Sequence, residues 1–291
     1  MRSSLPAFGA EPEYYRHVAK GYDLISETYD HVEAANWVGR RLREHMQAAL
    51  FRTFRPGQRV LEIGSGTGIE ALALAQRGVD VVATDLSEDM VLLLRRKADS
   101  LDLRNLASRR LAAHEIGSLA AEFGDASFDG AYSHGGVLNM DPRIEEVSAG
   151  LTRLLRPGAR FLSTVVNQTS LFEAVFYPLV GKPRKGYRRL GHDVPIPITR
   201  HEAYRKYVVP TRFYSPHAFV RILGDSFALR RLEGLQILLP PWNLSDYLDR
   251  LGPFARAVEA IEDRLADKRP FNSWGSIFLA ELERVSDGRD R

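Results

Sequence analysis

Cysteine is absent from this chain of 291 residues. That absence excludes disulfides, thiolate catalysis, iron–sulfur clusters and zinc ribbons. Long apolar runs are absent too, since none approaches the roughly 18–20 residues that cross a bilayer. The first residues, MRSSLPAFGAEPEYYRH, contain no apolar core of the kind that a secretory signal needs. These absences predict a cytoplasmic protein with no membrane partner.

Lysine is scarce, with 6 residues against 34 arginines. This bias favours a GC-rich bacterial source, in which natural product biosynthesis is common. Acidic and basic residues almost balance, because 37 Asp and Glu against 40 Lys and Arg leave a net charge of +3. The one dense basic stretch is Lys182–Arg189, KPRKGYRR. It is either a solvated surface or a site that attracts an anionic partner, such as a carboxylate, a phosphate, an acyl-carrier protein or RNA.

The remaining composition is that of a globular protein, with 44% apolar and 26% charged residues. Residues 1–55 are predicted to be helical, because apolar residues recur every three or four positions from Tyr14 to Leu24 and from Asn36 to Phe51. Strands then alternate with helices. The predicted strands are Val60–Ile63, Val79–Thr84, Ala107–Ala113, Phe128–Ser133 and Arg160–Val166, and the helices between them are Gly68–Arg77, Ser87–Asp99 and Asp141–Leu155. This alternation predicts a parallel sheet covered by helices on both faces.

The alternation stops at Asn167, where about 50 residues rich in aromatic and basic groups follow. A structureless loop of that length is uncommon in a compact domain, so we expect an inserted lid with its own short helices. The predicted elements beyond it are a helix from Ser215 to Leu223, a strand Phe227–Leu239, a helix Pro253–Asp267 and a strand Ser276–Arg284. The expected organisation is a helical cap (1–55), a cofactor-binding core (56–166), the lid (167–215) and the C-terminal part of the core sheet (216–291).

The strongest motif is VLEIGSGTG, Val60–Gly68, in which a buried strand runs directly into three glycines and a helix. Glycine allows a sharp turn and lets a ligand lie against bare backbone, and the N–H groups of the new helix face that ligand. Dinucleotide-binding enzymes use G-x-G-x-x-G, but here the third glycine comes one position early. Glu62 would also repel a pyrophosphate, whereas it would attract an ammonium or sulfonium group. The motif therefore favours S-adenosylmethionine over NAD.

A second signal is Asp85, which ends the second predicted strand 21 residues after Gly64. In doubly wound folds an acidic residue near this position binds the ribose hydroxyls. The alternative is that Glu62 pairs with an arginine and Asp85 only caps the next helix.

Together these residues resemble the class I S-adenosylmethionine-dependent methyltransferases of the small-molecule type, over roughly residues 20–166 and more loosely beyond. The resemblance implies a Rossmann-like, doubly wound sheet of seven strands with the last strand antiparallel. It places Leu86 on the adenine and either His114 or the backbone of Ala113 at the adenine edge, since Ala112 stands where many relatives have Asp. The implied cofactor-binding residues are Tyr22, Tyr29, Glu62, Gly64, Ser65, Gly66, Gly68, Asp85, Leu86, Met90, Ala113, His114 and Ser133.

The catalytic candidates are His134 and Tyr214. Methyl transfer from a sulfonium is an in-line displacement that needs orientation and exclusion of water, and a base only if the nucleophile starts protonated. His134 follows the fourth strand at the edge where ligands bind, so it is our first choice for a base or an orienter of the acceptor. Weaker candidates for the acceptor site are His192, His201, His217 and the pair Trp242-Asn243, and Asn139 is expected to cap the helix that begins at Asp141. No metal is expected. Some relatives of the resembled family bind magnesium through a cluster of acidic residues near the fourth and fifth strands, and this chain has Asp129 and Asp141 but no Asp-Asn pair after the fifth strand.

The sequence thus predicts methyl transfer to an oxygen or nitrogen of a small organic acceptor. Nucleic acid is not the expected partner, because the chain lacks an added RNA-binding module and the lid aromatics more simply form a small core. Three alternatives stay open: an RNA or protein methyltransferase that uses the basic stretch, a non-catalytic S-adenosylmethionine-binding protein, and an NAD-dependent oxidoreductase. The sequence leaves a homodimer open.

Overall fold

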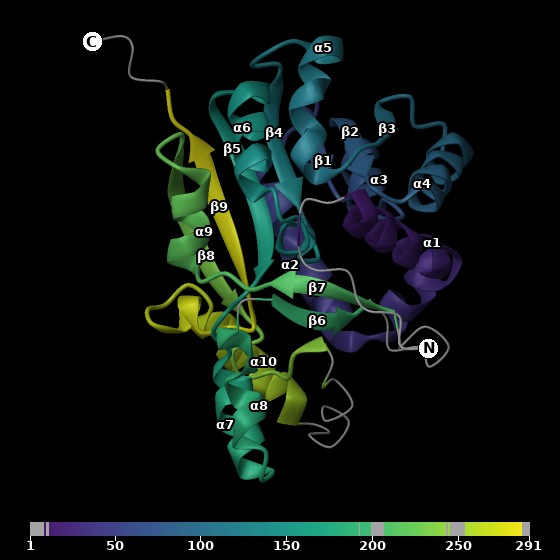
Figure 1. The fold of residues 1–291 in the computed structure, drawn as a ribbon. Coiled ribbons are helices and arrows are strands. Elements are labelled where there is room, and N and C mark those ends of the chain that lie inside the picture. Colours follow the sequence, from purple (N-terminus) through teal and green to yellow (C-terminus); the bar gives the residue numbers. More distant parts are fainter. Residues whose placement is uncertain are drawn as a thin grey trace.

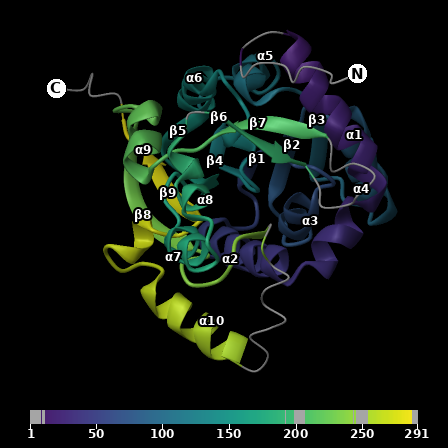
Figure 2. The same cartoon turned by 60° about the horizontal axis from the view of Figure 1, so that its bottom comes forward.

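The computed structural model describes residues 9, 12–191, 193–198, 207–242, 244 and 254–286. Figures 1 and 2 show a twisted sheet with helices on both faces and a smaller two-stranded sheet at one end. None of the helices in these ranges is both long and apolar enough to cross a membrane.

Seven strands form the main sheet, in the order β3-β2-β1-β4-β5-β9-β8. They are β1 (Arg59–Ile63), β2 (Asp80–Asp85), β3 (Leu106–Arg110), β4 (Phe128–Ser133), β5 (Leu155–Val166), β8 (Phe227–Leu235) and β9 (Ile277–Arg284). Strands β1 to β5 are parallel, whereas β9 lies antiparallel between β5 and β8. The predicted doubly wound fold with an antiparallel last strand is confirmed.

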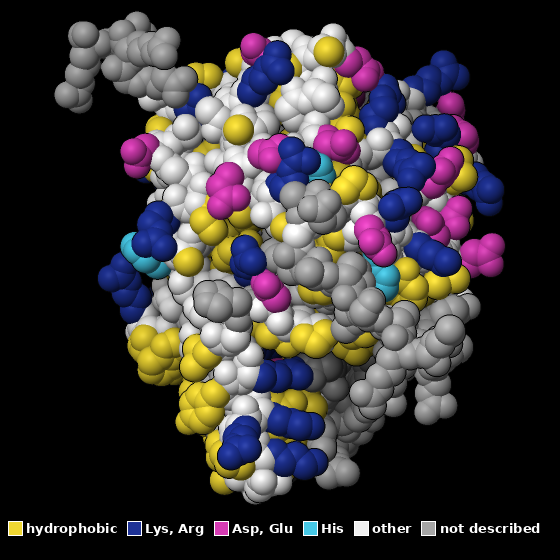
Figure 3. All heavy atoms as spheres, viewed as in Figure 1, with side chains coloured by type: hydrophobic (Ala, Val, Ile, Leu, Met, Phe, Trp, Pro, Cys, Tyr) yellow, Lys and Arg dark blue, Asp and Glu magenta, His cyan; other side chains and the backbone are white. Residues whose placement is uncertain are grey.

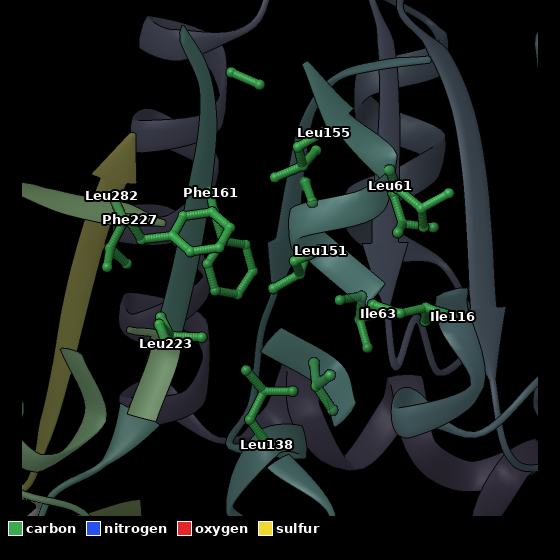
Figure 4. Packing of buried hydrophobic residues seen from close by; sticks show 14 of the residues in the cluster. Leu61, Ile63, Ile116, Leu138, Leu151, Leu155, Phe161, Leu223, Phe227 and Leu282 are labelled. Carbon is green, nitrogen blue, oxygen red and sulfur yellow. The ribbon is translucent and has the colours of Figure 1, made fainter. Parts of the chain in front are cut away.

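Helices cover the sheet because its strands bury side chains on both faces. On one face Leu61 and Ile63 of β1 pack with α6 (Ile144–Leu154), α9 (Pro216–Leu223) and the 3-10 helix η1 (Ala113–Leu119), as Figure 4 shows for part of this cluster. On the other face Val60 packs with α2 (Trp37–Thr53), α3 (Ile69–Ala75) and α4 (Glu88–Ser100). The remaining helices of the described ranges are α1 (Pro12–Ala35), α5 (Ala120–Phe123), α7 (Leu171–Leu179), α8 (Pro183–Gly186), α10 (Phe254–Leu265) and the 3-10 helices η2 (Val137–Asn139), η3 (Arg188–Leu190) and η6 (Phe271–Ser273).

Element boundaries differ from the prediction at several places: for example, the strand predicted as Phe227–Leu239 ends at Leu235, and three other differences have a clear local cause. Strand β3 ends at Arg110, because the chain enters η1 at Ala113. Helix α6 begins at Ile144, after Asp141 has accepted the N–H of Arg143 at 2.9 Å. Strand β5 begins at Leu155, earlier than predicted, since Leu155 already pairs with β4.

The segment predicted as a lid contains more than short helices. Helices α7 and α8 are followed by an antiparallel hairpin of β6 (Asp193–Pro197) and β7 (Val208–Arg212). These two strands were not predicted from the sequence. The hairpin lies over the end of the main sheet beside α1 (Figure 2). It is tied there by Tyr14, whose hydroxyl donates to the carbonyl of Pro210 at 3.0 Å, and by His17, whose ring stacks on Tyr207 at 4.4 Å. Helix α1 and the hairpin therefore roof the carboxyl ends of the strands.

Candidate active site

A cavity of about 540 Å³ lies beneath this roof, at the carboxyl ends of β1, β2, β4 and β5. Its position is the one at which open α/β sheets bind ligands. The predicted cofactor residues that line it are Tyr22, Tyr29, Glu62, Gly64, Ser65, Gly66, Asp85, Leu86, Met90 and Ala113, and the predicted catalytic residue His134 lines it as well. Gly68, His114, Ser133 and Tyr214 are placed elsewhere, as described below.

The glycine turn has two distinct functions. Gly66 has a φ of 52°, and a Cβ there would meet only the Tyr29 ring, at 4.0 Å, so its backbone stays open toward the cavity. Gly68 has a φ of 82°, and a Cβ there would come within 2.0 Å of a Leu94 methyl group. Gly68 therefore lets α3 pack closely on α4, and it lies behind the cavity wall rather than in it.

Asp85 braces this turn. One carboxylate oxygen accepts the N–H of Gly66 at 2.7 Å, and the other accepts the N–H of Ser87 at 2.8 Å. Burial raises the pKa of Asp85 to about 6, against the effect of these backbone hydrogen bonds. The side-chain cap of α4 is Ser87, which accepts the N–H of Met90. Since each carboxylate oxygen can accept more than one hydrogen bond, Asp85 keeps acceptor capacity toward the cavity.

Three carboxylates and one guanidinium share the wall next to the turn. Arg43 donates to both carboxylate oxygens of Glu70 at 2.8 Å and lies 3.9 Å from Glu33. Glu62 forms no ion pair within the described residues, and its Oε2 is buried without a hydrogen-bond partner. The arginine pairing considered for Glu62 is thus made by Glu70 instead. Burial, and next the charge of Glu70, raise the pKa of Glu62 well above its ordinary value.

Sequence reasoning missed Glu33, Glu70 and Arg43. Burial raises the pKa of Glu33 too, although the charge of Arg43 acts against the shift. A wall with three carboxylates and one guanidinium is suited to a cationic ligand. No local motif marks these residues, because they come from three separate helices and meet only in the fold.

Two aspartates hold the aromatic side chains of α1 over the cavity. Asp23 accepts the hydroxyl of Ser87, and Asp30 accepts the hydroxyl of Thr67 and the ammonium of Lys97. These contacts fix α1 against α4 and the glycine turn. The neighbouring residues Tyr22 and Tyr29 then line the cavity, as the resemblance implied.

His114 contributes to packing beside the cavity. Its Nδ1 lies 2.9 Å from Asp141, which also accepts the hydroxyl of Tyr15 at 3.0 Å, and the rings of Tyr15 and His114 are 4.6 Å apart. Of the two alternatives for the adenine edge, the one that lines the cavity is Ala113.

Three further candidates are structural in their observed contacts. Asn139 bonds the carbonyls of Val166 and Arg212 and accepts the N–H of Val166, so the prediction that it caps a helix is wrong. Ser133 is buried and donates to the carbonyl of Ile63 at 2.9 Å. Tyr214 belongs to the buried core, so its position does not support a catalytic role.

His134 follows β4 and lines the cavity. Its Nδ1 lies 3.1 Å from the hydroxyl of Thr164, which accepts the N–H of Gly135 at 2.9 Å. With Thr164 donating to Nδ1, the imidazole carries its own proton on Nε2, whereas the opposite tautomer reverses both roles. Burial lowers the pKa of His134 to about 4. At neutral pH His134 is therefore a neutral hydrogen-bond donor, which matches an orienting role better than that of a general base.

The basic stretch divides into an outer and an inner part. Lys182, Arg184 and Lys185 are exposed, and Figure 3 shows Lys and Arg side chains gathered at the lower end of the molecule, where Figure 1 places α7 and α8. Arg188 and Arg189 turn inward and line the cavity. Part of the stretch is thus solvated surface and part belongs to the site.

The weaker candidates have separate outcomes. Trp242 lines the cavity, whereas His217 is exposed and does not. His192, His201 and Asn243 lie outside the described residues. Sequence reasoning missed Gln236, a buried residue that lines the cavity after β8. The parts of the chain that the structure describes contain no cluster of His, Asp and Glu suited to a metal ion.

Comparison with known proteins also points to methyltransferases. Residues 60–158 match the family described as "Methyltransferase domain". The demethylmenaquinone methyltransferase of Symbiobacterium thermophilum is 28% identical over 153 residues, which are 52% of this chain and 59% of that protein. For other curated relatives the matched share of their length ranges from 27% to 62%, so the chain spans less than two thirds of each of these relatives.

Solved structures extend the similarity over nearly the whole fold. The (4+2)-cyclase SpnF has a TM-score of 0.61 at 15% identity, covering 98% of this chain and 99% of its own. The geranyl diphosphate C-methyltransferase of Streptomyces coelicolor A3(2), solved with S-adenosyl-L-homocysteine, has a TM-score of 0.54 at 15% identity, covering 84% of this chain and 80% of its own. At these identities the similarity shows the fold, including the regions before and after the matched domain.

Proposed function

We propose that the chain is a class I S-adenosylmethionine-dependent methyltransferase and that it transfers a methyl group from this cofactor to an oxygen or nitrogen of a small organic acceptor. The acceptor would bind in the part of the cavity beneath the β6–β7 hairpin. A role in specialised metabolism of a bacterium is the context we favour.

The observation that carries the proposal is the Glu62 carboxylate beside the glycine turn, which forms no ion pair among the described residues and whose buried Oε2 has no hydrogen-bond partner. A buried carboxylate without a partner is costly, and its cost falls when a cation arrives. S-adenosylmethionine carries an ammonium and a sulfonium, so its charge complements Glu62 and Glu33. Its ribose hydroxyls would meet Asp85, and the bare backbone at Gly66 leaves room for the nucleoside. NAD would place a pyrophosphate against these carboxylates and fits them poorly.

The chain's own residues would contribute orientation and exclusion of water. The cofactor, when bound, supplies an electrophilic methyl group. His134 can donate its Nε2 proton to a lone pair of the acceptor and hold it in position, while Thr164 fixes the ring. Tyr14, which bonds the carbonyls of Met140 and Pro210, closes the roof over the site. The neutral imidazole favours an acceptor whose nucleophile needs no strong base.

A direct test combines binding with product analysis. Isothermal titration should show binding of S-adenosylmethionine and S-adenosylhomocysteine and none of NADH. Incubation with S-adenosylmethionine and a panel of small phenols, amines and carboxylic acids should then yield S-adenosylhomocysteine and a product heavier by one methyl group. Binding of NADH alone would overturn the proposal.

The same measurements separate the alternatives. Tight cofactor binding without formation of S-adenosylhomocysteine with any acceptor class would indicate a non-methylating protein, a reading to which the fold similarity with a cyclase draws attention. Methylation of RNA, with affinity that falls steeply as salt rises, would favour the nucleic-acid alternative.

A further inference from the structure

A second part of the cavity wall, formed by η3 and the ends of β8 and β9, contains an amide without partners. Gln236 is 5% exposed, lines the cavity, and neither its Oε1 nor its Nε2 has a hydrogen-bond partner. Buried polar groups are almost always bonded, so an unpaired amide at a cavity indicates a missing ligand.

The backbone at Gln236 is held in an unusual conformation. Its φ is 57°, a left-handed value that side chains other than glycine seldom adopt. Two bonds fix it there: Glu262 accepts its N–H at 2.8 Å, and its carbonyl accepts the N–H of Ser276 at 3.1 Å. Strain of this kind persists where the surrounding structure enforces it, commonly at ligand sites.

Two arginine side chains, those of Arg188 and Arg189, line the same cavity. Arg189 donates to Glu173 at 2.9 and 3.1 Å and to the carbonyl of Ser276 at 2.9 Å. Arg188 also donates to Glu173, at 3.1 Å, but its Nε is buried without a partner. Two guanidinium groups therefore share the Glu173 carboxylate, and the other carboxylate beside Gln236, that of Glu262, accepts the N–H groups of residues 236–239.

Ser276 joins the two features, because its carbonyl binds Arg189 and its N–H binds Gln236. The wall around them is apolar, with Phe213 and Ile277 lining the cavity. Among the described residues, this end of the cavity wall gathers two guanidinium groups with Glu173, whereas the wall at the glycine turn gathers Glu33, Glu62 and Glu70 with Arg43.

We propose that Arg188 and Gln236 form an acceptor subsite that binds an anionic group, a carboxylate or a phosphate, on an otherwise apolar acceptor. The Nε of Arg188 and the amide N–H of Gln236 donate to that group, and Phe213 and Ile277 contact the apolar part. The assignment rests on the proposed methyl transfer for the word acceptor, while the anion subsite itself can be tested without turnover.

The test titrates protein saturated with S-adenosylhomocysteine with four probes: benzoate, phenyl phosphate, and their neutral counterparts benzamide and benzyl alcohol. One or both anions should bind, and the neutral compounds should bind at least about tenfold more weakly, as expected for loss of a charge-assisted hydrogen bond. Tighter binding of benzoate assigns a carboxylate acceptor, and tighter binding of phenyl phosphate assigns a phosphorylated one. Equal binding of anions and neutral compounds, or no binding of either anion, overturns the proposal.

Matched variants locate the subsite. Arg188→Ala should weaken anion binding about tenfold or more, whereas Lys185→Ala, an exposed basic residue of the same stretch, should change it less than about twofold. Gln236→Glu should abolish anion binding, and Gln76→Glu, the same change at an exposed position, should leave it intact. Equal losses in each pair would overturn the assignment.

Thermal denaturation and the affinity for S-adenosylhomocysteine accompany each variant. Affinity for S-adenosylhomocysteine should stay near the wild-type value in Gln236→Glu, so that loss of anion binding cannot be ascribed to unfolding, whereas its Tm should fall, because a buried carboxylate without a partner is costly. Failure of the wild-type protein to bind S-adenosylhomocysteine would instead contradict the proposed function, which separates the two failures.

Discussion

Glu62→Gln is expected to stabilise the protein without cofactor and to weaken its binding of S-adenosylmethionine. Glu62 is 1% exposed and its Oε2 has no partner, and leaving a buried acceptor unsatisfied costs about 1–3 kcal/mol. An amide has nearly the same shape but removes the repulsion from Glu70. We therefore expect stability to increase by about 1–2 kcal/mol, equivalent to a rise of roughly 2–6 °C in Tm.

The size of the stabilisation expected from Glu62→Gln depends on pH. Because the pKa of Glu62 is raised in the folded protein, the carboxyl is protonated in the fold at pH values where it ionises in the unfolded chain. The folded wild-type protein therefore binds more protons than the unfolded chain, and its free energy of unfolding falls as pH rises through the folded pKa of Glu62. The advantage of the glutamine variant should be small near pH 5 and grow toward pH 8.

Glu70→Gln is the matched control. It makes the same chemical change on the same wall, but it removes the partner that Arg43 contacts through two bonds of 2.8 Å. Breaking a buried ion pair of this kind should cost about 3 kcal/mol, the lower end of the usual range, because Arg43 keeps 15% of its side chain exposed. The two substitutions should thus shift Tm in opposite directions.

Differential scanning calorimetry and isothermal titration give both readouts. The affinity of Glu62→Gln for S-adenosylmethionine should fall about tenfold to a hundredfold, the cost of losing a hydrogen bond to a charged group. A Tm lowered by both substitutions would show that Glu62 is paired in solution. Unchanged cofactor affinity would refute its assignment to the cationic ligand.

Three further outcomes are expected. Gly68→Ala should destabilise the fold by about 3 kcal/mol in thermal unfolding, because a Cβ there would clash with Leu94 and the backbone has a positive φ. Gly66→Ala should have a Tm nearer to the wild-type value but a lower cofactor affinity in titration. Equal losses of stability in the two variants would contradict this division of roles. Affinity for S-adenosylmethionine should rise with pH, with protons released on binding, because a cation lowers the raised pKa of Glu62; titration in buffers of different ionisation enthalpy measures the release, and proton uptake would refute it. His134→Ala should reduce kcat about tenfold or more at unchanged S-adenosylhomocysteine affinity, and the wild-type rate should lack an ionisation near pH 6.5, because His134 is neutral above about pH 4.

Local sequence patterns were sufficient to predict the parts of the site whose residues lie close together in the sequence. Val60–Gly68 specifies a strand, a turn with positive φ and a helix start, and all three appear where the residue types require them. Asp85 ends the next strand and braces the glycine turn, and Ser87 caps the helix that follows that strand. These features depend on backbone conformation and hydrogen bonds within a few residues, which residue type controls directly.

Partner choice was decided only by the tertiary structure. Arg43 binds Glu70 rather than Glu62, and no spacing in the sequence distinguishes the two carboxylates. Thr164 bonds the His134 ring from 30 residues away, and Asn139 ties strands together where a helix cap was predicted. Burial and long-range contact determine which buried polar groups are paired, and these exist only after the sheet has formed.

The sequence by itself determined the doubly wound sheet, the glycine turn and the acid that braces it, because each follows from short-range periodicity and conformational preference. The tertiary structure alone decided the charge of each cavity wall. It directs Arg188 and Arg189 inward, leaves one carboxylate oxygen of Glu62 and the side-chain amide of Gln236 without partners, and folds the β6–β7 hairpin over them. Desolvation and pairing set the chemistry of those groups, and both are properties of the assembled fold.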